Sequence, residues 1–341
     1  MPYGGNDWLA LTQEPTLEPE LPICDPHHHF WDMRMERIPY QRYLLHELAA
    51  DVNSGHNIRS TVFIEARSMY RASGPVEMKP VGEVEFVQGL AAASASGMYG
   101  PCRVAAAIVG HADLKLGEKV KPVLDALKAA SPNRFRGIRH SVNWDPHPEV
   151  ESRQPKNIMT SSNFRAGARE LAKMGLSLEG WMYFHQLPDL ADLARTVPNL
   201  TIVLNHIGGL MRVGPYANKD EEVMGAWRKN IAELAKCPNV YCKLGGVGMT
   251  RTGFDWHTRE KPIGSEELAR SLAPLMNYCI EQFGPNRCMF ESNFPPDKVS
   301  SSYHVLFNAF KRLSKGYSPT ERAAMFHDTA AKVYRIEYPA K

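Results

Sequence analysis

The sequence predicts a single (β/α)8 barrel of the TIM type, in the α/β class, and three observations support this prediction. The 341 residues suit one barrel with elaborated loops. Short β-rich apolar runs alternate eight times with longer amphipathic stretches. The apolar runs are nearly continuous, which is typical of parallel strands that helices bury on both faces.

The predicted strands are short, and polar residues follow each of them. They span residues 21–24, 60–65, 104–109, 135–140, 176–184, 200–204, 240–244 and 288–291. Helical patterns separate them at residues 82–97, 119–131, 163–175, 188–197, 225–237, 265–284 and 303–316, and long loops are expected at 145–162 and 211–222. Neither GxGxxG nor GxxxxGK[ST] follows the first strand, which favours a closed barrel over an open nucleotide-binding sheet.

The predicted domain organisation is simple. Residues 1–20 are polar and contain prolines, so we expect an N-terminal extension that wraps the barrel or stays mobile. Residues 21–341 form the barrel domain. The six cysteines include no CxxC pair, which indicates reduced thiols in the core.

Composition excludes several classes of function. With 43% hydrophobic and 23% charged residues, the chain is typical of a water-soluble protein with a sizeable core. A formal charge of +3 is too balanced to predict binding to nucleic acid or to an acidic membrane. No apolar run is long enough to span a bilayer and the N-terminus does not read as a signal peptide, so we expect a cytoplasmic protein. A small molecule is the expected ligand, and a homodimer or an assembly with a paralogous subunit stays open.

Histidines follow five of the eight predicted strands. The carboxyl ends of the strands are where parallel barrels have their catalytic residues. His27 and His29 lie two residues apart on an extended segment, so their rings point to one side and that of His28 to the other. Two neutral imidazoles on one face would supply half of the ligands of a metal site. The alternative interpretation of these three histidines is a solvent-exposed turn.

Two further histidines extend this cluster. His185 follows the fifth strand and is predicted to be a ligand, with a buried core histidine as the alternative. His206 follows the sixth strand and is predicted to be a ligand or the general base. An imidazole cluster favours a divalent transition metal, with zinc as the first expectation and iron or manganese as alternatives.

Carboxylates and amides near the strand ends are candidates for proton transfer. Glu65 ends the second strand and is predicted to be catalytic or a metal ligand, with an ion pair to Arg67 or Arg139 as the alternative. Glu291 and Asn293 share one face of the eighth strand, with Glu291 deeper in the barrel. The Asn293 amide can coordinate or donate but cannot accept a proton.

Basic and aromatic residues are the candidates for substrate binding. Arg139 and His140 end the fourth strand and are predicted to orient an anionic or hydroxylated substrate. Three more residues are predicted to line the rim of the pocket: Trp31, Arg67 and Tyr70.

Five segments carry a resemblance to a known family: DPHHHFWD, FRGIRH, LPDLADLARTVPNLTIVLNHIGG, NVYCKLGGVGM and CMFESNFPPDK. In this order they resemble the amidohydrolase superfamily, specifically the amidohydrolase-2 group related to sugar lactonases and pyrone-dicarboxylate hydrolases. The resemblance covers nearly the whole chain. It implies a distorted (β/α)8 barrel in which one or two divalent ions are held by His27, His29, His185 and His206.

The sequence departs from the family at the end of the eighth strand. The lactonase pattern GSDWP has an aspartate that activates water, and Asn293 stands at that position. Two replacements are open: Glu65 could supply the missing charge as a ligand, or His206 could act as the base.

The expected function is metal-assisted hydrolysis of a small lactone or ester, and the same chemistry extends to an amide. The alternative from another enzyme class is a dinuclear non-haem iron oxygenase. Such an enzyme would need a different set of metal ligands, and a glutamate added at the end of the second strand would provide one. A related decarboxylase and a non-catalytic partner subunit are further alternatives.

Overall fold

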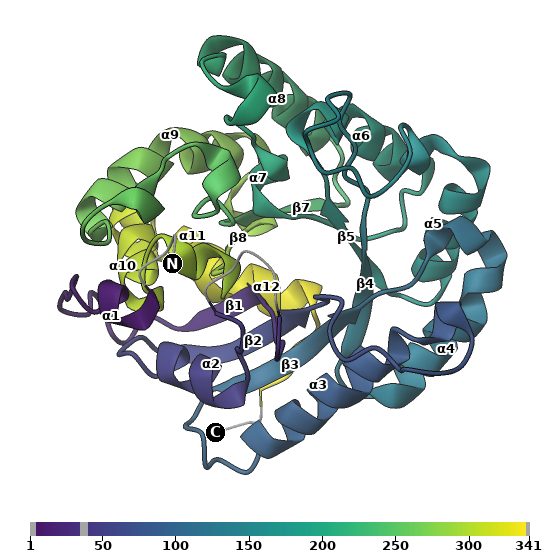
Figure 1. Cartoon of the computed structure of the whole chain (residues 1–341), viewed down its shortest axis with the longest axis horizontal. Helices are drawn as coiled ribbons and strands as arrows, with labels where there is room; N and C mark the ends of the chain where they lie inside the picture. The colour runs from purple at the N-terminus through teal and green to yellow at the C-terminus, as the bar shows by residue number, and fades with distance from the viewer. Residues whose placement is uncertain (1–4, 35–39, 339–341) are drawn as a thin grey trace.

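The computed structural model describes residues 5–34 and 40–338 and confirms the (β/α)8 barrel. Eight parallel strands follow one another in sequence order around the ring (Figure 1). They are β1 Ile23–His28, β2 Ile58–Ile64, β3 Arg103–Gly110, β4 Phe135–Ser141, β5 Ser177–Trp181, β6 Ile202–Leu204, β7 Val240–Leu244 and β8 Cys288–Phe290.

The ring closes between its first and last strands. A parallel bridge joins His28 to Phe294, just beyond β8. The His29 backbone N–H donates to the Phe294 carbonyl, and the Asn293 N–H donates to the His27 carbonyl, each over 2.9 Å. Closure therefore brings the polar segments after β1 and β8 side by side.

The main helices lie outside the ring (Figure 1). They are α2 Leu45–Val52, α3 Val81–Ser94, α4 Lys121–Ala130, α5 Ser162–Lys173, α6 Leu187–Thr196, α8 Asp220–Ala235, α9 Ser265–Phe283 and α10 Tyr303–Leu313. Shorter helices are α1 Gly5–Leu9, α7 His206–Gly209, α11 Pro319–Ala323 and α12 Thr329–Val333. The sequence did not predict α1, α2, α7, α11 or α12.

Helix α5 illustrates how the sequence builds this outer layer. Ser161 caps the helix, because its hydroxyl accepts a hydrogen bond from the Phe164 N–H. Phe164, Ala168 and Leu171 are buried at a spacing of three to four residues. This spacing gives the helix one apolar face toward the sheet.

The interior of the barrel is a second, smaller core. Inward-facing strand residues such as Val62 and Val109 pack with Val333 and Tyr334 from the C-terminal helix region. The interior is thus filled with side chains rather than open, as in other barrels of this class.

Residues 5–20 pack along α9 and α10. The Glu14 carboxylate accepts a hydrogen bond from the Ser265 N–H over 2.7 Å, and the Leu17 N–H donates to Asn308. This segment therefore wraps the barrel, one of the two behaviours expected for it.

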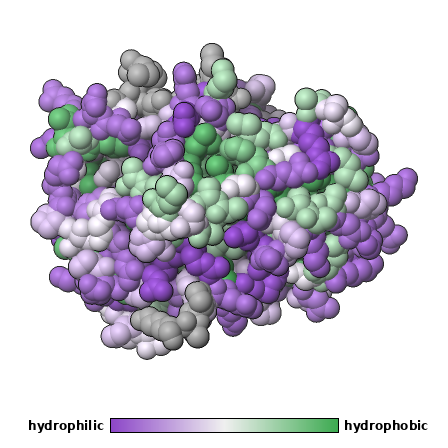
Figure 2. Space-filling view, turned by 90° about the horizontal axis from the view of Figure 1, so that it is seen from below, coloured by the Kyte–Doolittle hydropathy of each residue, from purple (hydrophilic) through white to green (hydrophobic). Residues whose placement is uncertain are grey.

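All six cysteines are buried in the core, and the structure has no disulfide between them. Within the described ranges, no helix combines the length and apolar character that a membrane crossing requires. Figure 2 shows polar side chains spread over one face of the molecule, with apolar side chains between them.

Candidate active site

A cavity of about 200 Å³ opens where the loops after the strands meet. It is large enough for a small molecule and lies at the end of the barrel where the fold places its chemistry. Its walls include several of the residues predicted from the sequence: His29, Trp31, Glu65, Arg67, Arg139, His206 and Asn293.

The three histidines at the end of β1 point to alternate sides, as predicted. His27 and His29 point to the same side, with their Nε2 atoms 3.2 Å apart. His28 points away from them, and its Nε2 lies 2.8 Å from the Thr61 hydroxyl. The extended backbone of this segment therefore brings two imidazole nitrogens together.

His206 reaches the same place from β6. Its ring centroid lies 4.6 Å from that of His27. Its backbone φ is +53°, a left-handed conformation that costs free energy in a residue other than glycine. Gly246, after β7, leaves the space for the ring, because a Cβ there would lie 2.1 Å from His206 Nδ1.

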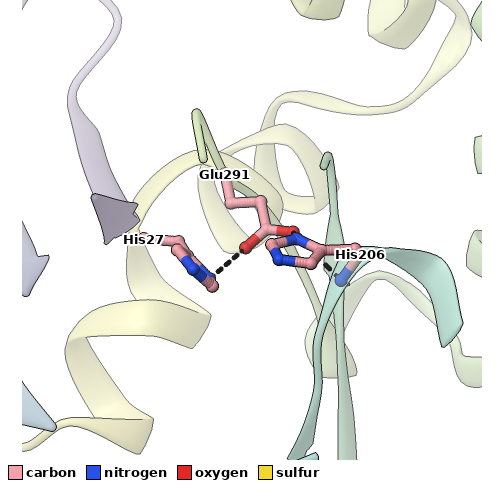
Figure 3. A group of neighbouring side chains, drawn as sticks. All are labelled: His27, His206 and Glu291. Atoms are coloured by element: carbon pink, nitrogen blue, oxygen red, sulfur yellow. Dashed lines mark hydrogen bonds and ion pairs between the residues drawn. The ribbon is translucent and has the colours of Figure 1, made fainter. Parts of the chain in front are cut away.

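Glu291 joins the two histidines, as Figure 3 shows. Its Oε1 lies 2.7 Å from His206 Nδ1, and its Oε2 lies 2.7 Å from His27 Nδ1. The contact to His27 is short but is not aligned as a hydrogen bond, so Oε2 lacks an aligned donor although it is buried. These three side chains are the only cluster of metal-binding donors found in the described part of the chain.

The partners of each ring decide which nitrogen carries the proton. His29 Nδ1 lies 2.8 Å from the Ile64 carbonyl, which can only accept, so its Nε2 is a lone pair. His27 Nδ1 lies 2.7 Å from the Glu291 carboxylate and 3.3 Å from Lys243 Nζ, and we place the ring proton on Nδ1 because the Glu291 contact is the shorter one. His27 Nε2, which lies 3.3 Å from Arg139 Nη1, then presents a lone pair. The contact of His206 Nδ1 with the Glu291 carboxylate leaves His206 Nε2 unprotonated in the same way.

Burial keeps these imidazoles neutral. It is the largest cause that lowers the pKa of His27, His29 and His206 well below the usual value of 6.5. Nearby cations lower it further, with Lys243 foremost at His27 and Arg251 at His206. Neutral imidazole is the form that binds metal ions.

A buried ion pair lies behind this cluster. Lys243 of β7 contacts Glu179 of β5 over 2.8 Å, and neither side chain is exposed. Lys243 Nζ also lies 3.3 Å from His27 Nδ1. The pair therefore places a cation next to the His27 ring from inside the barrel.

Glu65 forms an ion pair with Arg139, which was the alternative to a catalytic or metal-binding role. Its Oε1 accepts a hydrogen bond from Arg139 Nε over 2.9 Å, and Arg139 also donates to the Glu65 carbonyl. Arg139 is the main cation that holds the pKa of the Glu65 carboxyl low, against its burial. Both residues line the cavity, and they form an ion pair at its wall.

The structure does not bring His185 to the other histidines. Strand β5 ends at Trp181 rather than at residue 184, and a short helix, Phe184–Gln186, follows. His185 Nε2 instead lies 2.9 Å from the Asp145 carboxylate, which also accepts from the Tyr216 hydroxyl. The predicted ligand therefore lies in a separate surface network.

His140 and Tyr70 also lie outside the cavity wall. His140 follows Arg139 directly, so alternation along β4 turns one side chain inward and the other outward. Its Nδ1 accepts a hydrogen bond from the Leu114 N–H, and its ring packs on Phe164 of α5. The Tyr70 hydroxyl is buried without a hydrogen-bond partner among the described residues.

Asn293 lines the cavity and is held from behind. Its Nδ2 donates to Asp297 over 2.7 Å, and Asp297 also accepts from the Gly248 N–H. Burial raises the pKa of Asp297 to about 7. Asp297 fixes the amide, so Asn293 presents a constant hydrogen-bonding group to the cavity.

Sequence reasoning missed several residues of the cavity wall, including Arg34, Ser141, Trp181, Tyr183 and Arg251. For Trp181 the sequence did contain a signal. Trp181 lies two residues after Glu179 on β5, and the strand period of two puts both side chains on the same face of the strand. Arg251 lies in the loop after β7, where no periodic pattern indicates the direction of a side chain.

Comparisons with known proteins identify the family. The family model Amidohydro_2, described as amidohydrolase, matches residues 24–336. The chain belongs to this amidohydrolase family. As a member, it is an enzyme of the hydrolase type.

Two curated relatives of this amidohydrolase span almost its whole length. The protein y4mH of Sinorhizobium fredii is 31% identical and covers 93% of this chain and 99% of its own. An L-fucono-1,5-lactonase of Burkholderia multivorans is 25% identical over 93% of this chain and 97% of its own.

A solved structure shares the fold. It is an amidohydrolase from Burkholderia multivorans with bound zinc, with a TM-score of 0.70 and 24% identity, covering 92% of this chain and 99% of its own.

Proposed function

We propose that this amidohydrolase is a metal-dependent lactonase, which hydrolyses the ester bond of a small cyclic ester. The observation that carries the proposal is the meeting of His27, His29 and His206 next to the cavity, which His29 and His206 line, with Glu291 in contact with two of these rings. The similarity to L-fucono-1,5-lactonase over nearly the full length supports a lactone as the substrate class.

The donor set fits a transition metal. The Nε2 atoms of His27 and His29 present lone pairs 3.2 Å apart, and two lone pairs at this separation repel unless a cation lies between them. Tetrahedral zinc with bonds of about 2.0–2.1 Å to nitrogen separates two ligand atoms by about 3.3 Å. We assign His27, His29 and His206 as the ligands, and zinc as the metal because a relative of the same fold holds it.

Glu291 is the carboxylate that orients two of these ligands. Its contacts to Nδ1 of His27 and of His206 direct both Nε2 atoms away from the carboxylate. Carboxylate partners of this kind raise the basicity of a ligating imidazole and fix its orientation. Glu291 thus places a carboxyl group directly after β8, two residues before the position of the family aspartate.

A bound divalent ion would polarise the lactone carbonyl and make a bound water acidic. The chain's own groups then position the reactants. The Asn293 amide offers hydrogen bonds to water or to a substrate oxygen. Glu291 contacts the His27 and His206 rings at Nδ1, on the side away from the Nε2 atoms, so its part is to hold these two ligands in place. Arg139 lies beside His27 and stabilises negative charge that develops on the carbonyl oxygen.

The position of Glu65 favours hydrolysis over oxygenation. The oxygenase alternative needed a glutamate from the second strand as an added ligand. Arg139 binds this carboxylate along the cavity wall instead.

Elemental analysis of protein purified without added metal tests the ligand assignment. We expect about one zinc per chain in the wild type and a large loss in His27→Ala/His29→Ala. His185→Ala is the matched control, because this histidine binds Asp145 and should leave the metal content unchanged. Equal metal in the double variant and the wild type would refute the assignment, and so would loss of metal in His185→Ala alone.

Hydrolysis of a panel of aldonic and aldaric lactones, followed by acid release, tests the reaction. We expect turnover that a chelator abolishes and zinc restores. A chelator-resistant rate, or oxygen consumption by an iron-containing preparation, would contradict the proposal.

A further inference from the structure

Arginines dominate the charge of the cavity. Its wall contains five arginines and two glutamates. Both glutamates are already paired with an arginine of the same wall, Glu65 with Arg139 and Glu151 with Arg153. The cavity wall therefore has an excess of positive charge, which favours an anionic ligand.

Among the arginines of the cavity wall, Arg251 has the surroundings that best suit an anionic ligand. Its guanidinium carbon lies 4.5 Å from the centre of the Trp181 ring, in the position of a cation–π contact. Its Nε and Nη2 atoms are buried and have no hydrogen-bond partner among the described residues. Burying a charged donor without a partner costs free energy, so a structure that keeps such a group usually has a use for it.

The two unpaired nitrogens form one edge of the guanidinium. This edge, with two parallel N–H groups, matches the two oxygens of a carboxylate. Arg212 of this chain uses the same edge on a carboxylate, since its Nε and Nη2 both donate to Asp220. At Arg251 no described residue takes the place of this carboxylate, and Arg251 lines the cavity.

Arg251 and the proposed metal ligand His206 line the same cavity. Burial lowers the pKa of Arg251 itself to about 10, so the guanidinium is still charged at neutral pH. A group bound there would belong to the same small molecule that meets His206.

We propose that Arg251, stacked on Trp181, binds a carboxylate of the substrate, so that the lactone carries a carboxylate apart from its ester carbonyl. This inference deepens the proposed function and rests on it for the reaction, but the binding of the carboxylate can be measured without turnover.

Calorimetric titration with glutarate, at constant ionic strength, tests the proposal. Glutaramide is the neutral comparison, because it has the same length and lacks the charges. We expect the wild type to bind glutarate at least about ten-fold more tightly than glutaramide, since hydrogen bonds between a guanidinium and a carboxylate are charge-assisted on both sides. Arg251→Gln should lose about ten-fold or more in glutarate affinity, and Arg251→Lys should lose most of it because it keeps the charge without the fork.

Arg270→Gln is the matched control for net charge. Arg270 lies on the exposed surface of α9 and pairs with Glu266. Glutarate affinity that falls in both Arg251 variants and stays in Arg270→Gln supports the proposal. Equal affinity for glutarate and glutaramide, or equal loss in Arg251→Gln and Arg270→Gln, overturns it. Failure of the lactone panel with glutarate binding intact would refute the lactonase assignment and leave the carboxylate site standing.

Discussion

Glu291 binds His206 through one oxygen that lies 3.1 Å from its backbone nitrogen and 2.7 Å from ring Nδ1. The same carboxylate reaches His27 through its other oxygen. One acidic side chain of β8 thus sets the orientation of two histidines that are far apart in the sequence.

Glu291→Gln should weaken metal binding by about 10- to 100-fold, the usual effect of losing a carboxylate partner of a ligating histidine. The glutamine can still accept from His206, but its amide group meets the protonated Nδ1 of His27. Competition with a chelator of known affinity measures the change. The exposed Glu266→Gln serves as control, and unchanged metal affinity in Glu291→Gln would show that this carboxylate does not support the ligands.

Asn293→Asp restores the aspartate of the lactonase pattern, yet we expect it to lower stability and not to raise activity. Asp297 lies 2.7 Å from the Asn293 amide nitrogen, so the variant would place two buried carboxylates against each other. They would share a proton at low pH and repel at high pH. Thermal unfolding from pH 5 to pH 8 should show a midpoint that falls more steeply than in the wild type.

The exchange variant Asn293→Asp/Asp297→Asn is the control for this repulsion. It restores one donor and one acceptor across the contact, and we expect it to recover much of the lost stability. A single variant as stable as the wild type at pH 8 would contradict the argument.

The barrel and part of the site could be predicted because they follow from local periodicity. Alternating apolar runs and helical patterns specify the eight strands, and the period of two specifies that His27 and His29 share a face. His206 could be placed because β6 ends close to its predicted end, at residue 204.

The errors have equally local causes. An apolar run continues past the end of β5, and the hydrophobic pattern cannot show that the chain turns into a short helix at Phe184, which carries His185 away. His140 was predicted to bind substrate together with Arg139, but adjacent residues on a strand point to opposite faces, so only one of the two can face the cavity. The role of Glu291 depends on contacts with two other strands, which no sequence pattern specifies.

Gly246→Ala should disrupt the site more than a change of one methyl group normally does. The added Cβ would lie 2.1 Å from His206 Nδ1, and the φ of +65° disfavours residues other than glycine. We expect a loss of bound metal and of about 1–3 kcal/mol in the free energy of unfolding from the backbone conformation alone. Gly225→Ala, in α8 with open space around it, is the control and should be neutral or stabilising by up to about 1 kcal/mol. If Gly246→Ala kept its metal, the loop after β7 would have moved away from the His206 ring, and the close contact would not restrict the site as we expect.

Glu83 of α3 should make stability depend on pH. Its Oε1 accepts from the N–H groups of Ala66 and Ser68 and holds the loop after β2, while Oε2 is buried without a partner. Burial, and next the charge of Glu65, raise the pKa of Glu83 to about 8. In the unfolded chain this carboxyl ionises near 4.5.

Between these two values the folded state holds a proton that the unfolded state has released, so the free energy of unfolding falls as the pH rises from about 4.5 to about 8. Glu83→Gln keeps the accepting oxygen and removes the titration. Relative to the wild type, this variant should gain stability across that window, by an amount on the order of a few kcal/mol above pH 8. Denaturant unfolding at pH 5 and pH 9 measures the gain, with the exposed Glu77→Gln as control. A gain that is equal at both pH values would show that Glu83 is ionised in the folded protein throughout.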